Sequence, residues 1–424
     1  MDIGKRPFSV FWTPKMGRSM LLLLWCASIA SSLAPGLKLL ALAQQNPGFI
    51  SIDCGAPNPY TDVNIKIYYE TDNGFTDSGE NKQISTEYIY KNYIQFAKTL
   101  RSFPHGTRNC YTLKPDRGKN SLYLIKATFW YGDYDGKKEV PMFDLYIDVN
   151  YWTTIGDTDN MAEEIMYVSQ ADYIQVCVVN MGRGIPFISA LELRVLNNSI
   201  YGIGSGFLRN VWRRDMGASP ESFTRYPLDA YDRIWWGYDN FSQLPPSTGA
   251  SATSLSNNND AYEVPGEVLM TAATSRYSSL SYSWTPRKSY VLPGNWILYF
   301  HFAEIESGQQ REFTVSINGN QFTKSVTLEY LKPVTVVSTP VTGSQINILI
   351  SPTSNESPSP PILNAIEVYY IGGLPNVQTA EDDGISLLRR VFLVPIRMLS
   401  YQKSSKVDMN NEMVKKRLIT YLIT

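Results

Sequence analysis

The feature that most constrains the fold is a strand-like segment that occurs twice. "PFISALELRVL" begins at residue 186 and "PILNAIEVYYI" begins at residue 361, an offset of 175 residues. Successive side chains of a strand point to opposite faces, so Leu191 and Leu193 share one face in the first copy while Glu192 lies on the other. In the second copy Ile366 and Glu367 are divided in the same way. This alternation predicts a strand with one face on a core and the other face in water.

The similarity continues upstream of both segments. Residues 123–149 and 296–320 each contain an apolar strand, a turn with charged residues or glycine, and an alternating strand. A repeat of about 170 residues is far longer than the roughly 20–50 residues of a solenoid unit. It predicts two tandem all-β domains, residues 46–200 and 201–371.

The first 43 residues have the organisation of a secretory signal. Basic residues from Lys5 to Arg18 precede the apolar run "MLLLLWCASIASSLA", and small residues end at Ala43. We expect cleavage there and passage through the secretory pathway to the cell surface or outside the cell. The alternative is an uncleaved membrane anchor, since residues 20–43 are long enough to span a bilayer. Lys38 and Pro35 within this stretch argue against the anchor.

Three acceptor sequons for N-linked glycans fit an extracellular chain, at Asn197, Asn240 and Asn355. Pro358, soon after the third, weakens that site.

Four cysteines are present, and Cys26 lies in the signal segment. Among the remaining three, Cys54 and Cys110 lie near strand ends, whereas Cys177 lies between valines in the middle of a strand. We therefore favour a Cys54–Cys110 disulfide with Cys177 as a buried thiol. A Cys54–Cys177 bond and the absence of any bond remain open.

Composition argues against several functions. The formal net charge is −1 and 18% of residues are charged, without the basic patch that nucleic-acid binding requires. The two histidines, His105 and His301, have no metal-ligand spacing, so no metal or cofactor is predicted. His301 could form an acid–base group with Glu304 and Glu306, but a strand histidine bonded to a neighbour is the simpler interpretation. We expect no catalytic residues and no enzyme.

The candidate ligand-binding site is the loop "WYGDYDGKKEVP", residues 130–141. It contains a concentration of aromatic rings and short carboxylates, at Trp130, Tyr131, Asp133, Tyr134 and Asp135. Rings can stack on a sugar and carboxylates can accept hydrogen bonds from its hydroxyls. The alternative is an ordinary hairpin loop in which glycine and aspartate supply the turn geometry.

Ordered motifs resemble those of plant malectin-like domains over residues 48–370. They include "GFISIDCGAP", "YGDYDG", "YIQVCVVNMGRGIPFISALELR", "YPLDAYDRIWW", "LYFHFAEIE" and "PPILNAIEV". The chain is similar to the extracellular part of a leucine-rich-repeat receptor-like kinase of the malectin-like type. The resemblance implies two tandem β-sandwiches of jelly-roll type, related to an animal carbohydrate-binding protein.

The implied function is a non-enzymatic recognition module, a truncated receptor-like ectodomain whose partner is a cell-wall glycan or a peptide or protein ligand. The alternatives are a structural or decoy partner of full-length receptor-like kinases and, less favoured, a carbohydrate-active enzyme. Residues 372–424 replace the repeats, membrane span and kinase that the resemblance implies. We expect an irregular or disordered tail, either a short basic helix near residues 409–422 or a frame-shifted remnant.

Overall fold

The structure is a computed structural model of the chain. It describes residues 48–89, 95–156, 162–203, 206–244, 251–256, 260–275, 279–286, 294–353 and 359–373. The expected signal segment, the acceptor site at Asn355 and the tail beyond residue 373 lie outside these ranges. Strands predominate within them, and the helices are short: η1 (Thr86–Tyr88), η2 (Gln95–Ala97), α2 (Ala252–Ser256) and α3 (Gly266–Leu269). None of these helices is long and apolar enough to cross a membrane.

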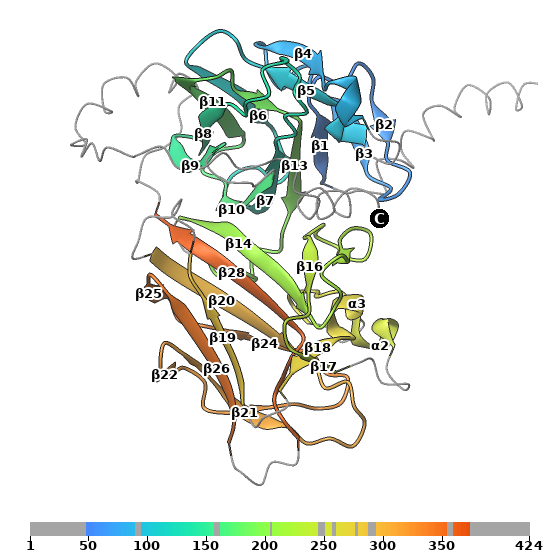
Figure 1. The fold of residues 1–424 in the computed structure, drawn as a ribbon, viewed down its shortest axis with the longest axis vertical. Helices are drawn as coiled ribbons and strands as arrows, with labels where there is room; N and C mark the ends of the chain where they lie inside the picture. Colours follow the sequence, from blue (N-terminus) through green and yellow to red (C-terminus); the bar gives the residue numbers. More distant parts are fainter. Residues whose placement is uncertain are drawn as a thin grey trace, which may run out of the picture. The chain divides into compact units, whose positions relative to one another are not determined.

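One sheet continues through both halves of the described chain (Figure 1). Its first strands, in spatial order, are β2 (Tyr60–Thr61), β3 (Tyr68–Thr71), β1 (Ile50–Asp53), β13 (Ala190–Val195), β7 (Leu122–Thr128) and β10 (Ala162–Val168). The order continues with β14 (Phe207–Met216), β28 (Ala365–Gly372), β20 (Gly294–Phe302) and β24 (Val334–Val337). Three further strands attach to this path, namely β15 (Phe223–Thr224), β16 (Trp235–Tyr238) and β25 (Val341–Gly343). The halves join where β10 pairs with β14.

Smaller sheets complete the first half. One contains β6 (Arg108–Leu113), β11 (Ile174–Arg183), β8 (Met142–Ile147) and β9 (Asn150–Ile155), and another contains β12 (Phe187–Ile188), β5 (Thr99–Ser102) and β4 (Glu80–Gln83). A single apolar core includes Leu191 and Leu193 of β13 together with Val176 and Val178 of β11. Apolar side chains alternate along these strands because only one face of each strand meets the core.

The second half has the corresponding parts. Opposite the long sheet lie β19 (Leu280–Trp284), β26 (Ile346–Pro352), β21 (Glu312–Ile317), β22 (Asn320–Gln321) and β23 (Val326–Thr327). A small sheet contains β17 (Ser242–Leu244), β18 (Ala272–Thr274) and β27 (Ile362–Leu363). A second core includes Ile366 and Val368 of β28. The architecture is therefore all-β, as predicted. The domain boundary at residue 200 stays a prediction.

The two copies of the repeated strand occupy equivalent places, as predicted. β13 lies between β1 and β7, and Glu192 stands opposite Lys126. β28 lies between β14 and β20, and Glu367 stands opposite Tyr299. Each copy is thus an inner strand of its half, which explains the shared apolar pattern.

The second face of the repeated strand is buried, so the prediction of a face in water is wrong. Glu192 is 1% exposed and Glu367 is 0% exposed. Leu196, Ile200 and Tyr201, which follow β13, form a further apolar cluster on the long sheet. The sequence pattern identifies a polar face, but it does not show that another segment covers it.

A second covering segment is residues 223–234, here called the clasp. Arg225 donates a hydrogen bond to Glu192 at 3.2 Å. Arg233 donates to the hydroxyl of Tyr201 at 2.8 Å, and that hydroxyl donates to Glu367 at 2.7 Å. The clasp therefore connects, directly or through one side chain, to both repeated glutamates.

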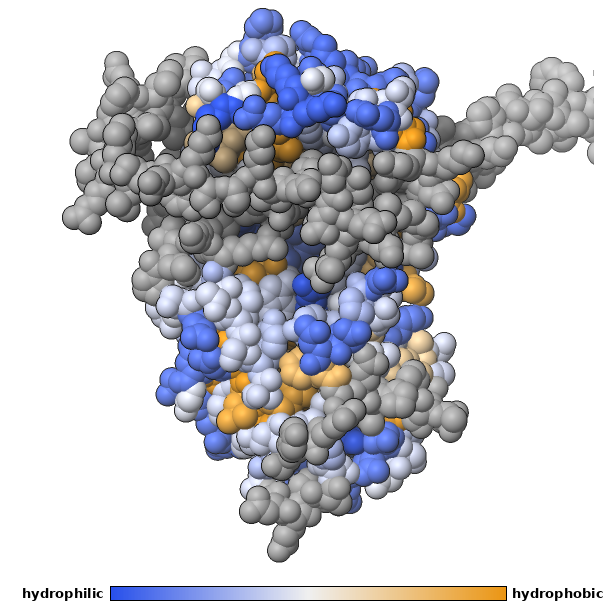
Figure 2. Space-filling model, viewed as in Figure 1, coloured by the Kyte–Doolittle hydropathy of each residue, from blue (hydrophilic) through white to orange (hydrophobic). Residues whose placement is uncertain are grey.

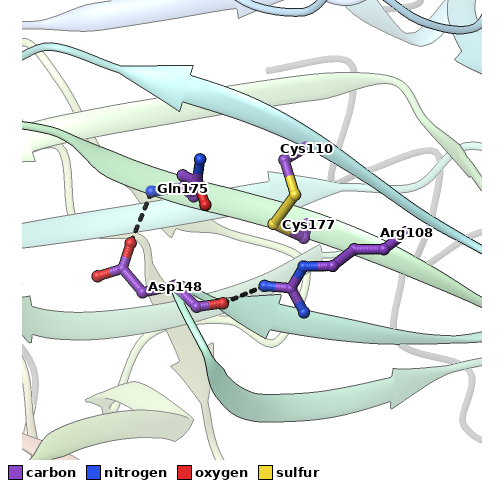
Figure 3. Close-up of a disulfide and its surroundings, with 5 residues drawn as sticks. All are labelled: Arg108, Cys110, Asp148, Gln175 and Cys177. Atoms are coloured by element: carbon purple, nitrogen blue, oxygen red, sulfur yellow. Dashed lines mark hydrogen bonds between the residues drawn. A yellow bond between two sulfur atoms is a disulfide. The ribbon is translucent and has the colours of Figure 1, made fainter. Parts of the chain in front are cut away.

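The disulfide joins Cys110 to Cys177, so the predicted Cys54–Cys110 bond is wrong (Figure 3). Cys110 and Cys177 stand directly opposite each other on β6 and β11, with Cα atoms 4.0 Å apart. Val176 and Val178 point into the core, so the side chain of Cys177 points to the opposite face, where Cys110 lies. Cys54 is the buried free thiol.

Candidate functional site

The loop of residues 130–141 connects β7 to β8 and brings the five predicted site residues together. Its aromatic rings, however, are largely packed inward. Trp130 and Tyr131 are 8% and 7% exposed and belong to the first core. Tyr131 and Tyr134 meet edge to face at 5.6 Å between ring centroids, and both contact Phe187. The faces of Trp130 and Tyr131 thus contribute to packing, and Tyr134 is the half-buried ring of the three.

The two carboxylates fix the shape of this loop. Asp133 accepts hydrogen bonds from the backbone N–H of Lys138 at 2.7 Å and from the hydroxyl of Tyr131 at 3.3 Å. Asp135 accepts from the same hydroxyl and from the backbone N–H of Lys137 at 3.3 Å. Such side-chain-to-backbone bonds are typical of aspartate in turns. The hydrogen bonds of Asp133 and Asp135 therefore match the alternative interpretation from the sequence, in which these aspartates supply the turn geometry.

Gly132 anchors the start of the loop. Its φ is +47°, and its carbonyl accepts a hydrogen bond from the backbone N–H of Ser85 at 2.8 Å. A Cβ atom at this position would lie 2.5 Å from the side chain of Ile84. Only glycine permits this backbone conformation and this close approach.

Burial keeps both tyrosines of the loop protonated. It raises the pKa of Tyr131, and the hydrogen bond to Asp135 raises it further. Burial also raises the pKa of Tyr134, with the charge of Asp135 adding to the effect. Both phenols therefore remain neutral hydroxyls across the physiological range.

The exposed part of the loop is its tip, residues 136–140. Val140 is 40% exposed and the side chain of Lys137 is 60% exposed. The end of β11 lies beside the loop, because a Cβ atom on Gly184, which directly follows the strand, would lie 2.6 Å from Pro141. Met181, near the end of β11 where its register against β8 shifts, is 45% exposed. The face drawn in Figure 2 is mainly hydrophilic, with hydrophobic residues in separate patches. The tip combines the apolar Val140, the basic Lys137 and Lys138 and the acidic Glu139 on a hydrogen-bonded base.

The alternative acid–base group around His301 does not form. His301 is 1% exposed, and its ring nitrogens contact the hydroxyl of Thr335 at 2.9 Å and the carboxylate of Glu367 at 3.1 Å. Glu304 instead bonds to Arg311. His301 is therefore a core histidine bonded to its neighbours, as the simpler interpretation held.

No group of three or more histidine, cysteine, aspartate or glutamate side chains in the described ranges is arranged to hold a metal ion.

Two buried aspartates escaped the sequence analysis. Asp53 accepts a hydrogen bond from Thr99 at 2.6 Å, and Asp215 accepts one from Thr271 at 2.7 Å. They stand opposite equivalent alanines, since Asp53 pairs with Ala190 and Asp215 with Ala365. The signal is visible in the sequence as Asp-x-Gly-Ala at residues 53–56 and 215–218.

The same turn geometry follows both aspartates. Gly55 and Gly217 have φ values of +81° and +119°. A Cβ atom on either residue would lie within 3 Å of the backbone at Leu100 or Ala272. The two halves therefore share this feature as well: in each, a glycine lets the turn approach a neighbouring backbone, at Leu100 or at Ala272, more closely than a side chain would allow.

Comparison with known proteins identifies the family of both halves. The sequence profile of the malectin-like domain matches residues 52–371. The chain belongs to the malectin-like domain family.

The curated relatives are receptor kinases of Arabidopsis thaliana. A receptor-like protein kinase is 36% identical over 375 residues, which cover 84% of this chain and 40% of the kinase. The protein named "Probable LRR receptor-like serine/threonine-protein kinase MEE39" is 37% identical over 363 residues, covering 82% of this chain and 40% of the kinase. The malectin-like chain thus spans about 40% of the length of these relatives.

Solved malectin-like ectodomains have the same fold. The ANX2 ectodomain of Arabidopsis thaliana superposes with a TM-score of 0.62 at 15% identity, covering 78% of this chain and all of that one. The plant receptor-like kinase FER, in a complex with the peptide RALF23 and with LLG2, superposes with a TM-score of 0.60 at 13% identity. That match covers 77% of this chain and 96% of the solved FER chain. These similarities show the tandem malectin-like fold.

Proposed function

We propose that this chain is a non-enzymatic extracellular recognition module that binds a peptide or protein ligand through the loop tip, residues 136–140. The observation that carries the proposal is the contrast within the loop. Its base is fixed by the bonds of Asp133 and Asp135, while Val140 and Lys137, whose ammonium lies 3.6 Å from Asp135, are exposed to solvent. A rigid loop loses little conformational entropy on binding, which favours affinity.

The exposed chemistry at the tip favours a peptide with apolar and acidic residues. Val140, and Met181 on the adjacent strand β11, can bury apolar side chains. Lys138 can pair with a carboxylate, whereas the ammonium of Lys137 already lies 3.6 Å from Asp135 and Glu139 adds one acidic group to the tip. FER, which has the same fold, was solved in a complex with a peptide and a second protein. That complex supports the choice of a peptide, and it says nothing about which peptide this chain binds.

A cell-wall glycan is the second candidate ligand. Tyr134 is half-buried and the side chain of Asp135 is 14% exposed, so one ring and one carboxylate are partly accessible beside the tip. One ring and one acid provide a smaller stacking surface than the three rings suggested by the sequence. The glycan therefore ranks below the peptide.

The test is a binding screen with the purified, secreted full chain. A library of acidic-apolar peptides and an array of cell-wall oligosaccharides are the probes. The double variant Lys137→Ala, Val140→Ser should weaken peptide binding by at least about tenfold, the scale of roughly 1.4 kcal/mol. Val63→Ser, at a residue 74% exposed, is the control and should bind as the wild type does.

Two results would overturn this assignment. Equal peptide affinity of the tip variant and the wild type would exclude the tip. Binding to oligosaccharides alone, lost in Tyr134→Ser, would make the glycan the ligand.

A further inference from the structure

A triad of aromatic rings lies at the edge of the second half. Tyr238 ends β16, Phe241 follows it in the turn, and Tyr282 belongs to β19. The ring centroids are 5.9 Å apart for Tyr238–Phe241 and for Tyr238–Tyr282, and 6.0 Å apart for Phe241–Tyr282. All three side chains pack against the second core but remain partly exposed. Arg214 lies over the ring of Tyr238 at 5.6 Å and Trp212 meets Tyr282 edge to face at 5.8 Å, so the triad offers only the rest of its aromatic surface to solvent.

Asn240 lies in the same turn, between two members of the triad. The sequence Tyr-Asp-Asn-Phe-Ser at residues 238–242 contains an Asn-x-Ser acceptor sequon. Asn240 and Asp239 are both exposed, while Tyr238 and Phe241 on either side of them are half-buried. A sugar attached to Asn240 would therefore begin within reach of these rings.

We propose that Asn240 carries an N-linked glycan whose first N-acetylglucosamine packs on the triad of Tyr238, Phe241 and Tyr282 and stabilises this half of the molecule. A pyranose ring has an apolar face of C–H groups that packs against aromatic rings. The covalent link holds the sugar at high effective concentration beside the triad, so even a weak contact is occupied. The inference rests on the extracellular location proposed above.

The attachment is an ordinary group transfer. The side-chain nitrogen of Asn240 forms a bond to C1 of the sugar, and the bond from C1 to the pyrophosphate of a lipid-linked oligosaccharide breaks. One amide proton is lost, and the lipid pyrophosphate leaves. The transferase and the donor belong to the secretory pathway.

Asn197 provides a matched control within the same chain. It lies in an exposed turn after β13 and has the same type of sequon. Its side-chain oxygen accepts hydrogen bonds from the backbone N–H and the hydroxyl of Ser199, both at 3.0 Å. The nearest aromatic residue in sequence, Tyr201, is 0% exposed. A glycan at Asn197 therefore has no exposed aromatic residue within four positions of it in the sequence.

The experiment uses the full chain secreted from plant or insect cells. Peptide mass spectrometry measures the occupancy of Asn240 and Asn197. Two enzymatic treatments follow, one that leaves a single N-acetylglucosamine and one that removes the whole glycan. The single-sugar form should keep the thermal midpoint of the untreated protein, whereas complete removal should lower it by about 2–4 °C.

Three variants locate the effect. Asn240→Gln should reproduce the fall in midpoint, and Asn197→Gln should not. Phe241→Leu keeps the sequon and an apolar side chain but removes one ring. In this variant, complete removal of the glycan should lower the thermal midpoint by less than half of the fall seen in the wild type. This comparison of glycan removal in two backgrounds isolates the contact between sugar and ring.

Several outcomes would overturn the inference. Occupancy of Asn197 without occupancy of Asn240 excludes the site. An occupied Asn240 whose glycan can be removed without any change in midpoint excludes the contact. Occupancy of neither residue overturns both this inference and the extracellular location. A failed ligand screen with Asn240 occupied refutes only the proposed recognition function.

Discussion

Removing the carboxylate of Glu367 should destabilise the protein strongly. This side chain is 0% exposed and accepts hydrogen bonds from Arg213 at 2.6 Å, Tyr201 at 2.7 Å, His301 at 3.1 Å and also Tyr369. Burial alone would raise the pKa of Glu367, but the charges and hydrogen bonds of Arg213 and His301 lower it. Glu367→Ala leaves these donors buried without their acceptor.

The expected loss follows from the cost of an unpaired buried charge. Removing one partner of a buried ion pair costs about 3–5 kcal/mol in free energy of unfolding. Arg213 keeps a bond to Glu164 at 2.8 Å, which places the estimate toward the lower end. For a cooperative unit of 150–250 residues, about 3–5 kcal/mol corresponds to a fall of roughly 6–20 °C in thermal midpoint.

Urea unfolding followed by tryptophan fluorescence, with calorimetry, would measure this loss. Glu192→Ala, the equivalent change in the first half, should have a comparable effect, because Lys126 and Arg194 contact Glu192 at 2.8 and 2.7 Å. Glu329→Ala is the control, since Glu329 has a 68% exposed side chain paired with Lys332, and it should change stability by at most about 0.5 kcal/mol. A loss below about 1 kcal/mol for Glu367→Ala would refute the account of the buried network.

Three further predictions concern the repeated turns and the disulfide. Burial raises the pKa of Asp53 to about 6 and that of Asp215 to about 7. Each stays protonated in the folded state after the unfolded chain has lost its proton, so stability should fall as pH rises from about 4 to 7. Asp215→Asn should flatten this slope in urea titrations, and an unchanged slope would contradict the assignment. Cys110→Ser with Cys177→Ser should lower the free energy of unfolding by about 2–5 kcal/mol, because the bond closes a separation of 67 residues. Disulfide mapping that instead finds Cys54 bonded would refute this pairing. Gly217→Ala should cost more than about 1 kcal/mol, because φ is +119° and the backbone of Ala272 lies 2.8 Å from the added Cβ. Gly308→Ala, where φ is also positive at +80° but nothing lies within 4 Å of the added Cβ, is the control for the close approach and should cost less.

The position of the repeated strand could be predicted because side-chain alternation is a local property. Leu191 and Ile366 face the two cores, as the pattern indicates. The burial of Glu192 and Glu367 could not be predicted in the same way. It depends on residues 196–201 and on the clasp, whose sequences do not reveal what they cover.

The candidate site shows a similar limit. The sequence placed aromatic rings and carboxylates in one loop, and the structure brings them together. It could not show that Trp130 and Tyr131 point into the core, because an aromatic ring suits a core and a binding surface equally well.

The disulfide error has a different origin. The alternation of side chains along a strand indicates that Cys177 points away from the face of Val176 and Val178. Its partner, however, can be found only from the register of β6 against β11. Register across 67 residues of sequence is a tertiary property.

The most direct test of the central claim is the affinity of the secreted full chain for peptides selected from an acidic-apolar library, measured side by side with the tip variant Lys137→Ala, Val140→Ser. The account predicts saturable binding by the wild type, at least about tenfold weaker binding by the variant, and equal thermal midpoints for the two proteins. Equal affinity, with both proteins folded, would contradict the claim that this loop tip is the recognition surface.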